Sequence, residues 1–256
     1  MEIAYYCVTN KIDSKNNLIQ SAHQPNFLPW IGYFAKINQS HVFVFSDDVR
    51  YSKQQLTNRA NFIDVNGKTF TCTIPVNKTS GSRLFEKTIT LEERRILDRG
   101  IARIKNDYRS TPFYSDMCNI IYKVHEMLDA HHKLVDFNVS CIGYLAKIFN
   151  INYLQLLGTE LNLHLYESNQ RLVQRAKALE IPNYLCGRGA ASYQDDEFLH
   201  KQGLNVLYAN YSEIENQFGS DAGYSILHTI SHYGIEKIRE HFTTSAYRAV
   251  GVAYVK

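Results

Sequence analysis

The chain has 256 residues, a formal net charge of +3 at pH 7, 45% hydrophobic residues and 12% aromatic residues. This length fits one large domain at about 150 residues per domain, so we expect a single domain over residues 1–256. The nearly balanced charge and the lack of a lysine or arginine run argue against a nucleic-acid partner.

The cysteines and the hydropathy pattern bear on the cellular compartment. Five cysteines are scattered along the chain without a C-x-x-C pair, which predicts reduced thiols rather than a disulfide framework. No stretch reaches the about 18 consecutive apolar residues of a membrane span, and the first residues do not resemble a signal peptide. We therefore expect a soluble, cytoplasmic protein without a membrane span.

The first part of the chain predicts a strand, a loop, a helix and a second strand. Residues 1–17 are expected to form an N-terminal extension, which includes a β-prone run over residues 3–8. A strand is predicted over residues 17–22, apolar residues at helical spacing cover residues 30–37, and a second strand is predicted over residues 41–45. This order is typical of a βαβ unit, in which ligands bind where loops leave the carboxyl ends of strands.

The loop between the first strand and the helix is stiffened by Pro25 and Pro29. Each proline fixes its own φ and pushes the preceding residue toward an extended conformation. A stiff loop at a strand end can present polar side chains to a pocket at little ordering cost, and the polar side chains of this loop are His23, Gln24 and Asn26. An ordinary proline-marked turn with Trp30 in the core is the alternative.

The middle of the chain predicts a hairpin and then helices. Residues 58–65 and 68–74 are β-prone and flank Asn66-Gly67, which is the strongest short signal for a hairpin. An amphipathic helix is predicted over residues 91–106, with its arginines on a solvated face. Its apolar stripe consists of Ile96, Leu97, Ile101 and Ile104. Further helices reach residue 150, so we expect residues 91–150 to form a helical insertion or cap.

The last part of the chain returns to alternating strands and helices. Strands are predicted over residues 151–156, 184–186 and 204–208, and helices over residues 168–179 and 225–242, the latter interrupted at Gly234. Strands that alternate with helices predict the α/β class with a mostly parallel sheet.

A second loop at a strand end runs from Cys186 to Tyr193. It contains Gly187-Arg188-Gly189, and its two glycines admit a close backbone approach. The spacing matches neither the dinucleotide motif nor the P-loop, so the phosphate signal is weak.

Several of these motifs together resemble the WbqC-like family. The motifs are, in chain order, His23 to Phe34, Asp47 to Tyr51, Asn58-Arg59, Tyr108 to Phe113, Tyr184 to Ala190 with Tyr193, and Tyr224 to Gly234. They occur in the order of the family, and they define a family-like core over about residues 18–235.

Two positions depart from the family pattern. Cys186 stands where the family tends to have Ser before the first glycine, and His228 stands where it tends to have Asp. A covalent nucleophile at Cys186 is the less favoured interpretation, because the loop offers Arg188 but no base beside the thiol. Because His228 stands at this position, the chain lacks the acid that the family pattern has in its closing helix.

The resemblance implies a bacterial protein of O-antigen or related lipopolysaccharide biosynthesis. The activity that we expect from it is a transferase, moving an acyl or aminoacyl group to the amino group of a nucleotide-activated sugar. The donor would be a thioester of an acyl carrier protein or of coenzyme A, and no cofactor or metal would be tightly bound.

Amide formation from a thioester needs a base, a donor to the developing oxyanion and accurate placement. His23 is the candidate base, and Asp47 or Asp48 could orient its imidazole or capture the amine. Adjacent residues of a strand point to opposite faces, so we expect at most one of the two aspartates to face the pocket. The alternatives are a His23 that bonds a backbone carbonyl, and an aspartate pair that forms a turn or a metal site.

The remaining site candidates are assigned to substrate binding. Arg59, with Asn58, suits a phosphate or carboxylate, although a structural role for the arginine is equally open. Tyr51 and Tyr193 could stack on a base or sugar, with core packing as the alternative. The other predicted binding residues, several of them oxyanion donors, are Gln24, Asn26, Trp30, Gly187, Arg188 and Gly189.

Two other functional classes stay open. A histidine-containing loop between a strand and a helix resembles the start of nucleotidylyltransferases and ligases that use ATP, although their second histidine is replaced here by Asn26. A non-catalytic module could instead bind a sugar nucleotide or an acidic acyl carrier protein. The arginines that could receive such a carrier are Arg94, Arg95, Arg99 and Arg103.

Overall fold

The computed structural model describes residues 17–244 except residues 54, 91, 92, 164 and 167. The N-terminal extension before residue 17, with its predicted β-prone run over residues 3–8, lies outside the described residues. So do the first two residues of the helix predicted over residues 91–106.

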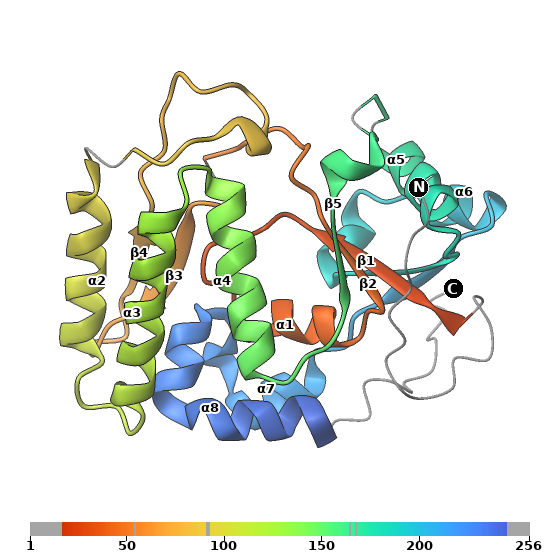
Figure 1. The fold of residues 1–256 in the computed structure, drawn as a ribbon. Helices are drawn as coiled ribbons and strands as arrows, with labels where there is room; N and C mark the ends of the chain where they lie inside the picture. Colours follow the sequence, from red (N-terminus) through yellow and green to blue (C-terminus); the bar gives the residue numbers. More distant parts are fainter. Residues whose placement is uncertain (1–16, 54, 91–92, 164, 167, 245–256) are drawn as a thin grey trace.

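The centre of the protein is a parallel sheet of five strands (Figure 1). In order along the sheet, the strands are β5 (Leu154–Leu157), β2 (Val42–Phe45), β1 (Ile19–His23), β6 (Asn183–Cys186) and β7 (Asn205–Tyr208). Every neighbouring pair is parallel. Counted along the chain within this sheet, the order is 3-2-1-4-5, which is that of a doubly wound fold. The predicted α/β class with a mostly parallel sheet is confirmed.

Helices cover both faces of this sheet because its strands alternate their side chains between the faces. Phe43 and Phe45 of β2 belong to the larger core, which α1 (Ile31–Asn38), α4 (Leu134–Ile148) and α8 (Ile226–Thr244) also join. Val42 and Val44 of the same strand point the other way and pack with Leu179 of α5 (Ser168–Leu179). The predicted βαβ opening is confirmed as β1, α1 and β2.

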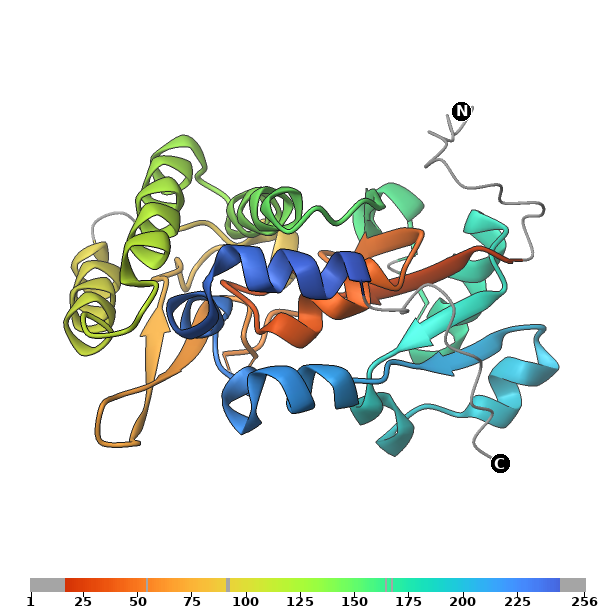
Figure 2. The same ribbon diagram turned by 90° about the horizontal axis from the view of Figure 1, so that it is seen from below.

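An insertion separates β2 from β5. It starts with an antiparallel hairpin, β3 (Arg59–Ile63) and β4 (Thr69–Thr73), and continues through α2 (Arg95–Asp107) and α3 (Tyr114–Ala130) to α4. Gly67 in the turn has φ of 77°, which explains the glycine of the Asn-Gly signal. The hairpin, α2 and α3 lie at one end of the molecule in both views (Figures 1 and 2).

The stripe predicted for α2 needs one correction. Leu97, Ile101 and Ile104 are buried, whereas Ile96 is 46% exposed. Residues 97, 101 and 104 follow the spacing of three and four that keeps side chains on one helical face, and residue 96 falls beside that face.

The closing helix has the predicted break. Gly234 interrupts α8 with φ of 77°, a conformation that favours glycine. A Cβ atom at this position would approach within 2.7 Å of the Phe113 ring, so the absence of a side chain also permits this packing. Within residues 17–244 as described, no helix is both long and apolar enough to cross a membrane.

Candidate functional site

The main candidate site is a cleft at the carboxyl ends of β1 and β6. Ser21 pairs with Leu185 in the sheet, so His23 and Gly187, each two residues further on, end at the same level. Strand order reverses between these two strands, and ligands of doubly wound sheets bind at such a switch point. The cleft has a volume of about 370 Å³ and is lined by His23, Trp30, Tyr33, Lys36, Gly187, Arg188, Gly189, Tyr211 and Glu215.

His23 presents a neutral imidazole to the cleft. Its Nδ1 lies 3.0 Å from the carbonyl oxygen of Gln24, which can only accept, so Nδ1 carries the hydrogen and Nε2 keeps a lone pair. The edge of the ring packs against Tyr33, with ring centres 5.0 Å apart. Desolvation by the surrounding protein, and then the positive charge of Lys36, lower the pKa of His23 to about 4. The side chain nevertheless remains exposed on the side that faces the cleft.

Lys36 forms part of the same wall and was not predicted as a site residue. It lies on α1, it is only 4% exposed, and its Nζ donates to the carbonyl oxygen of Ala22 over 2.8 Å. Burial is the main cause that lowers the pKa of this lysine to about 8, with Arg175 adding to the effect and Cys186 opposing it. A lysine among the mostly apolar residues of this eight-residue helix was the available sequence signal.

Trp30 forms an aromatic rim of the cleft with Tyr211. The two ring centres lie 5.0 Å apart at a steep angle. Trp30 is the N-cap of α1, and its indole folds back over Gly32, where any Cβ atom would overlap the six-membered ring. The Trp-x-Gly spacing of the sequence therefore positions this indole.

Arg188 and the two neighbouring glycines form the opposite wall. The guanidinium of Arg188 lies 3.3 Å from Glu215 and 3.3 Å from the side-chain oxygen of Asn210, and it also covers the Tyr211 ring. Glu215 belongs to α7 (Ser212–Phe218). A Cβ atom at Gly187 would have only the Tyr211 hydroxyl within 4 Å, so both glycines leave backbone open to the cleft.

Asp47 and Asp48 lie beside the cleft at the end of β2, but neither lines it. Asp47 accepts hydrogen bonds from the amide and the hydroxyl of Thr159 at 2.9 and 2.7 Å, and Asp48 forms an ion pair with Arg171. Both carboxylates approach Gly158. The prediction that they point to opposite faces is wrong, because β2 ends at Phe45 and strand alternation no longer applies.

The residues that begin the hairpin lie outside the cleft. The Asn58 side chain is buried and donates to the carbonyl of Ile74 at 2.8 Å. Arg59 pairs with Thr73 in the hairpin and is close enough to Tyr51 to oppose the rise in its pKa that burial causes. The Tyr51 ring packs against the core and lies 5.2 Å from the Lys87 ammonium. All three residues thus lie in the insertion, where Asn58 Oδ1 and Arg59 Nε are buried without a hydrogen-bond partner among the described residues.

Three other predicted residues also lie outside the lining of the cleft. Gln24 contributes its carbonyl oxygen, which accepts from both His23 and the Tyr33 hydroxyl. Asn26 is buried, with 6% of its surface exposed, and Tyr193 is 75% exposed beyond the glycine turn. The structure therefore brings together five of the predicted residues, namely His23, Trp30, Gly187, Arg188 and Gly189.

Cys186 is held as a buried thiol. Its Sγ donates to the carbonyl oxygen of Leu207 at 3.2 Å, and burial raises its pKa to about 11. A thiol in this state is a poor nucleophile at neutral pH. Among the described residues, no group of three or more histidine, cysteine, aspartate or glutamate side chains could hold a metal ion.

Helix α2, with its arginines, lies at the other end of the molecule from α6 (Asp196–Lys201), as the two ribbon views show for the helices (Figures 1 and 2). Arg94 pairs with Asp129 and Asp98, and Arg103 pairs with Asp64 and Asp107. These carboxylates neutralise part of the arginine surface that an acidic carrier protein would contact.

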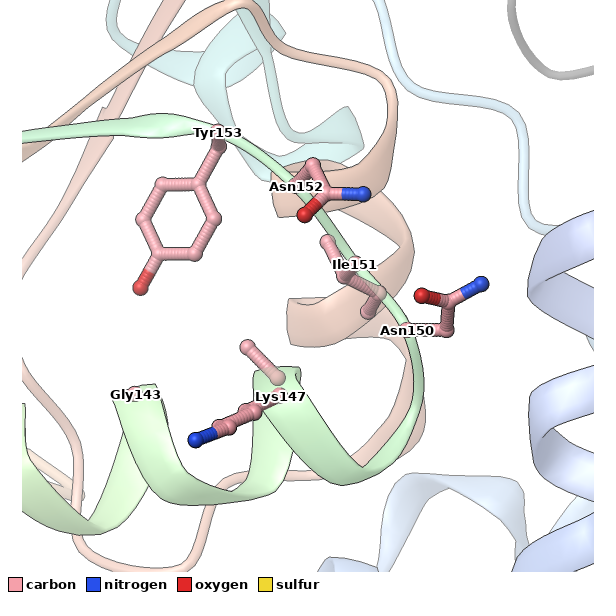
Figure 3. Close-up of a pocket in the computed structure, with 7 residues that line it drawn as sticks. Gly143, Lys147, Asn150, Ile151, Asn152 and Tyr153 are labelled. Atoms are coloured by element: carbon pink, nitrogen blue, oxygen red, sulfur yellow. The ribbon is translucent and has the colours of Figure 1, made fainter. Parts of the chain in front are cut away.

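A second, smaller cavity of about 210 Å³ lies between α4 and the residues that precede the edge strand β5. Lys147 of α4 and Tyr153 border it (Figure 3). It contains none of the predicted site residues, and it provides a lysine outside the cleft for comparison with Lys36.

A doubly wound parallel sheet with a polar cleft at its switch point defines a class of ligand-binding α/β proteins, many of them enzymes. Residues 24–240 match the model of the WbqC-like protein family, and the chain belongs to this family. No curated protein and no solved structure gives a significant match.

Proposed function

We propose that the cleft transfers an acyl or aminoacyl group from a thioester to the amino group of a nucleotide-activated sugar, as part of surface-polysaccharide synthesis in the cytoplasm. The observation that carries this proposal is the neutral His23 imidazole, whose Nδ1 is fixed on a backbone carbonyl and whose Nε2 is available in an open cleft. This tautomer suits a general base.

The reaction needs one proton to move. The amine of the sugar attacks the acyl carbon, the C–N bond forms, and the C–S bond of the thioester breaks. His23 Nε2 accepts the proton that the amine loses and returns it to the leaving thiolate, so that an amide and a thiol are the products. Backbone at Gly187 and Gly189 is open to the cleft, where the developing oxyanion could be stabilised.

The other lining residues support the binding of an activated sugar. Arg188 offers a partly exposed guanidinium for phosphate oxygens. The half-buried Trp30 ring offers an aromatic surface for a base or sugar.

The direct test combines acyl carrier protein or coenzyme A thioesters with nucleotide-linked amino sugars. Release of free thiol and formation of the amide, followed by mass spectrometry, report the reaction. Turnover that disappears in His23→Gln supports the proposal. Tight binding of a sugar nucleotide without turnover in any donor and acceptor mixture would instead favour the binding module.

The strand order favours one second candidate, an enzyme that uses ATP to transfer a nucleotidyl group or to activate a carboxylate. The 3-2-1-4-5 sheet with His23 at the end of its first strand is an arrangement that suits nucleotide binding. ATP would then raise the melting temperature and release pyrophosphate during turnover, whereas acyl thioesters would do neither.

A further inference from the structure

Lys36 is a buried cation without a carboxylate partner among the described residues. Its Nζ has one hydrogen-bond acceptor, the Ala22 carbonyl, although an ammonium has three hydrogens to donate. A charged amine that is 4% exposed and incompletely paired is destabilised by lost hydration. Lys36 is also one of the residues that line the cleft.

The groups around Lys36 do not balance its charge. His23 of β1 is neutral, Cys186 of β6 is a thiol whose pKa lies at about 11, and Arg175 of α5 is a second cation. Tyr33 and Tyr211 are phenols whose pKa burial raises. Of the nine residues that line the cleft, one is acidic, namely Glu215, and its carboxylate pairs with Arg188. The cleft therefore carries an excess of positive charge.

We propose that Lys36 binds a phosphate of a nucleoside diphosphate in this cleft, and that the bound phosphate makes His23 a stronger base. This inference rests on the proposed function, because it assumes that the substrate amine is activated at His23. It adds a positioning residue, Lys36, that the sequence did not indicate.

Three features favour a nucleoside diphosphate over a simple carboxylate. Lys36 and Arg188 offer two separate cations, which suits two adjacent phosphates. Gly187 and Gly189 allow the backbone to approach the oxygens closely. Trp30 and Tyr211 provide an aromatic rim for the base or sugar ring.

The coupling to His23 follows from electrostatics. The Lys36 ammonium is one of the two causes that keep the His23 pKa low. The diphosphate of a nucleotide-activated sugar carries two negative charges in total. Bound at Lys36, it offsets the ammonium charge and adds negative charge nearby, and both changes favour the protonated imidazole. His23 would thus be a weak base in the empty cleft and a stronger base when the substrate is bound.

The test uses UDP as the probe and compares wild type, Lys36→Met and Lys36→Arg, with Lys147→Met as the matched control from the other cavity. Calorimetry at pH 7 should give a Kd at least about tenfold weaker for Lys36→Met, an intermediate value for Lys36→Arg and an unchanged value for Lys147→Met. Histidine NMR, assigned by the signal lost in His23→Gln, should show the His23 pKa rising by about one unit or more with saturating UDP in wild type.

Wild-type protein gives an independent measurement that needs no substitution. Sulfate stays a dianion from pH 6 to 10, so its affinity should fall as the pH rises through about 8, where free Lys36 loses its proton. Equal UDP affinity in wild type and in a folded Lys36→Met would overturn the proposal, as would a His23 pKa that UDP leaves unchanged. UDP binding that depends on Lys36 without any acyl transfer would reject the proposed reaction while retaining the phosphate site.

Discussion

The Nζ atom of Lys36 lies 2.8 Å from the carbonyl oxygen of Ala22, the residue that immediately precedes His23. This bond ties α1 to the last residues of β1 and fixes an ammonium beside the imidazole that ends the strand. Both groups line one cleft, and the Lys36 ammonium adds to the lowering of the His23 pKa. We therefore propose that this site works through a lysine and a histidine together rather than through a single base.

Replacement of His23 should separate catalysis from folding. His23→Gln should lower kcat of the proposed transfer by about 10²–10⁴-fold, because a positioned acid–base group contributes a factor of this size. The side chain is exposed, so the free energy of unfolding should change by less than about 0.5 kcal/mol. Thiol release and urea unfolding measure the two effects.

The matched control for this prediction is His132→Gln, at an exposed histidine that does not line the cleft. Its activity should equal that of wild type. Full activity of His23→Gln in the same assay would show that the imidazole has no role in the proposed transfer.

Gly32→Ala should displace the indole that borders the cleft. A Cβ atom at this position overlaps the Trp30 ring, so the ring has to move although alanine otherwise favours a helix. Trp30 is the single tryptophan of the chain, so its fluorescence reports this movement directly. The emission maximum should shift, and UDP affinity should fall severalfold.

Gly143→Ala provides the control for this change. Gly143 is also helical, and a Cβ atom there meets nothing within 4 Å. Its emission spectrum and UDP affinity should match those of wild type. A Gly32→Ala spectrum that is also unchanged would show that the indole does not depend on this glycine.

The parts of the site that could be predicted follow from local sequence rules. The βαβ opening, the hairpin turn and the end of β6 have strong local signals, and the strand-end rule correctly placed His23 with the Gly187 turn. Tyr211 and Glu215 were missed because α7 has seven residues and too little periodicity to detect. Lys36 was missed because the direction of its ammonium depends on how α1 packs against the sheet.

The positions of Arg59 and the two aspartates depend on tertiary contacts that spacing alone does not encode. Arg59 follows β2 closely in sequence, but β3 carries it into the hairpin beside Tyr51. Asp47 and Asp48 meet Thr159 and Arg171, which are more than a hundred residues away along the chain.

Gly234→Ala should destabilise the junction between α8 and the insertion. The residue has φ of 77°, and an added Cβ atom would press against the Phe113 ring. Strain in the left-handed region together with this overlap should lower the free energy of unfolding by about 2 kcal/mol or more. The control is Gly223→Ala, whose free energy of unfolding in urea should be close to that of wild type. A Cβ atom at Gly223 would meet nothing within 4 Å, and the φ of Gly223 is not positive. Equal stability of the two variants would contradict the prediction.

His228 should make the protein less stable in mild acid. Its Nδ1 lies 2.9 Å from the Tyr108 hydroxyl, its ring packs at a tilt against His232, and Tyr224 and Asp221 lie nearby. Burial, and then the charge of His232, lower the His228 pKa from 6.5 to about 4, against the opposing effect of Asp221. Between these two pH values the unfolded chain binds the extra proton, so stability falls as the pH decreases from 6.5 toward 4 and is unaffected by this group above that window.

The contribution of His228 between pH 7 and pH 5 should be about 2 kcal/mol. Urea unfolding of His228→Gln at the two pH values should show a pH dependence smaller by this amount than that of wild type. His200→Gln, at an exposed histidine of α6, should keep the wild-type dependence. If His228→Gln loses as much stability as wild type on acidification, the His228 imidazole is not the group that the acid protonates. His23 and His241, whose pKa values are also lowered to about 4, then become the residues to substitute next.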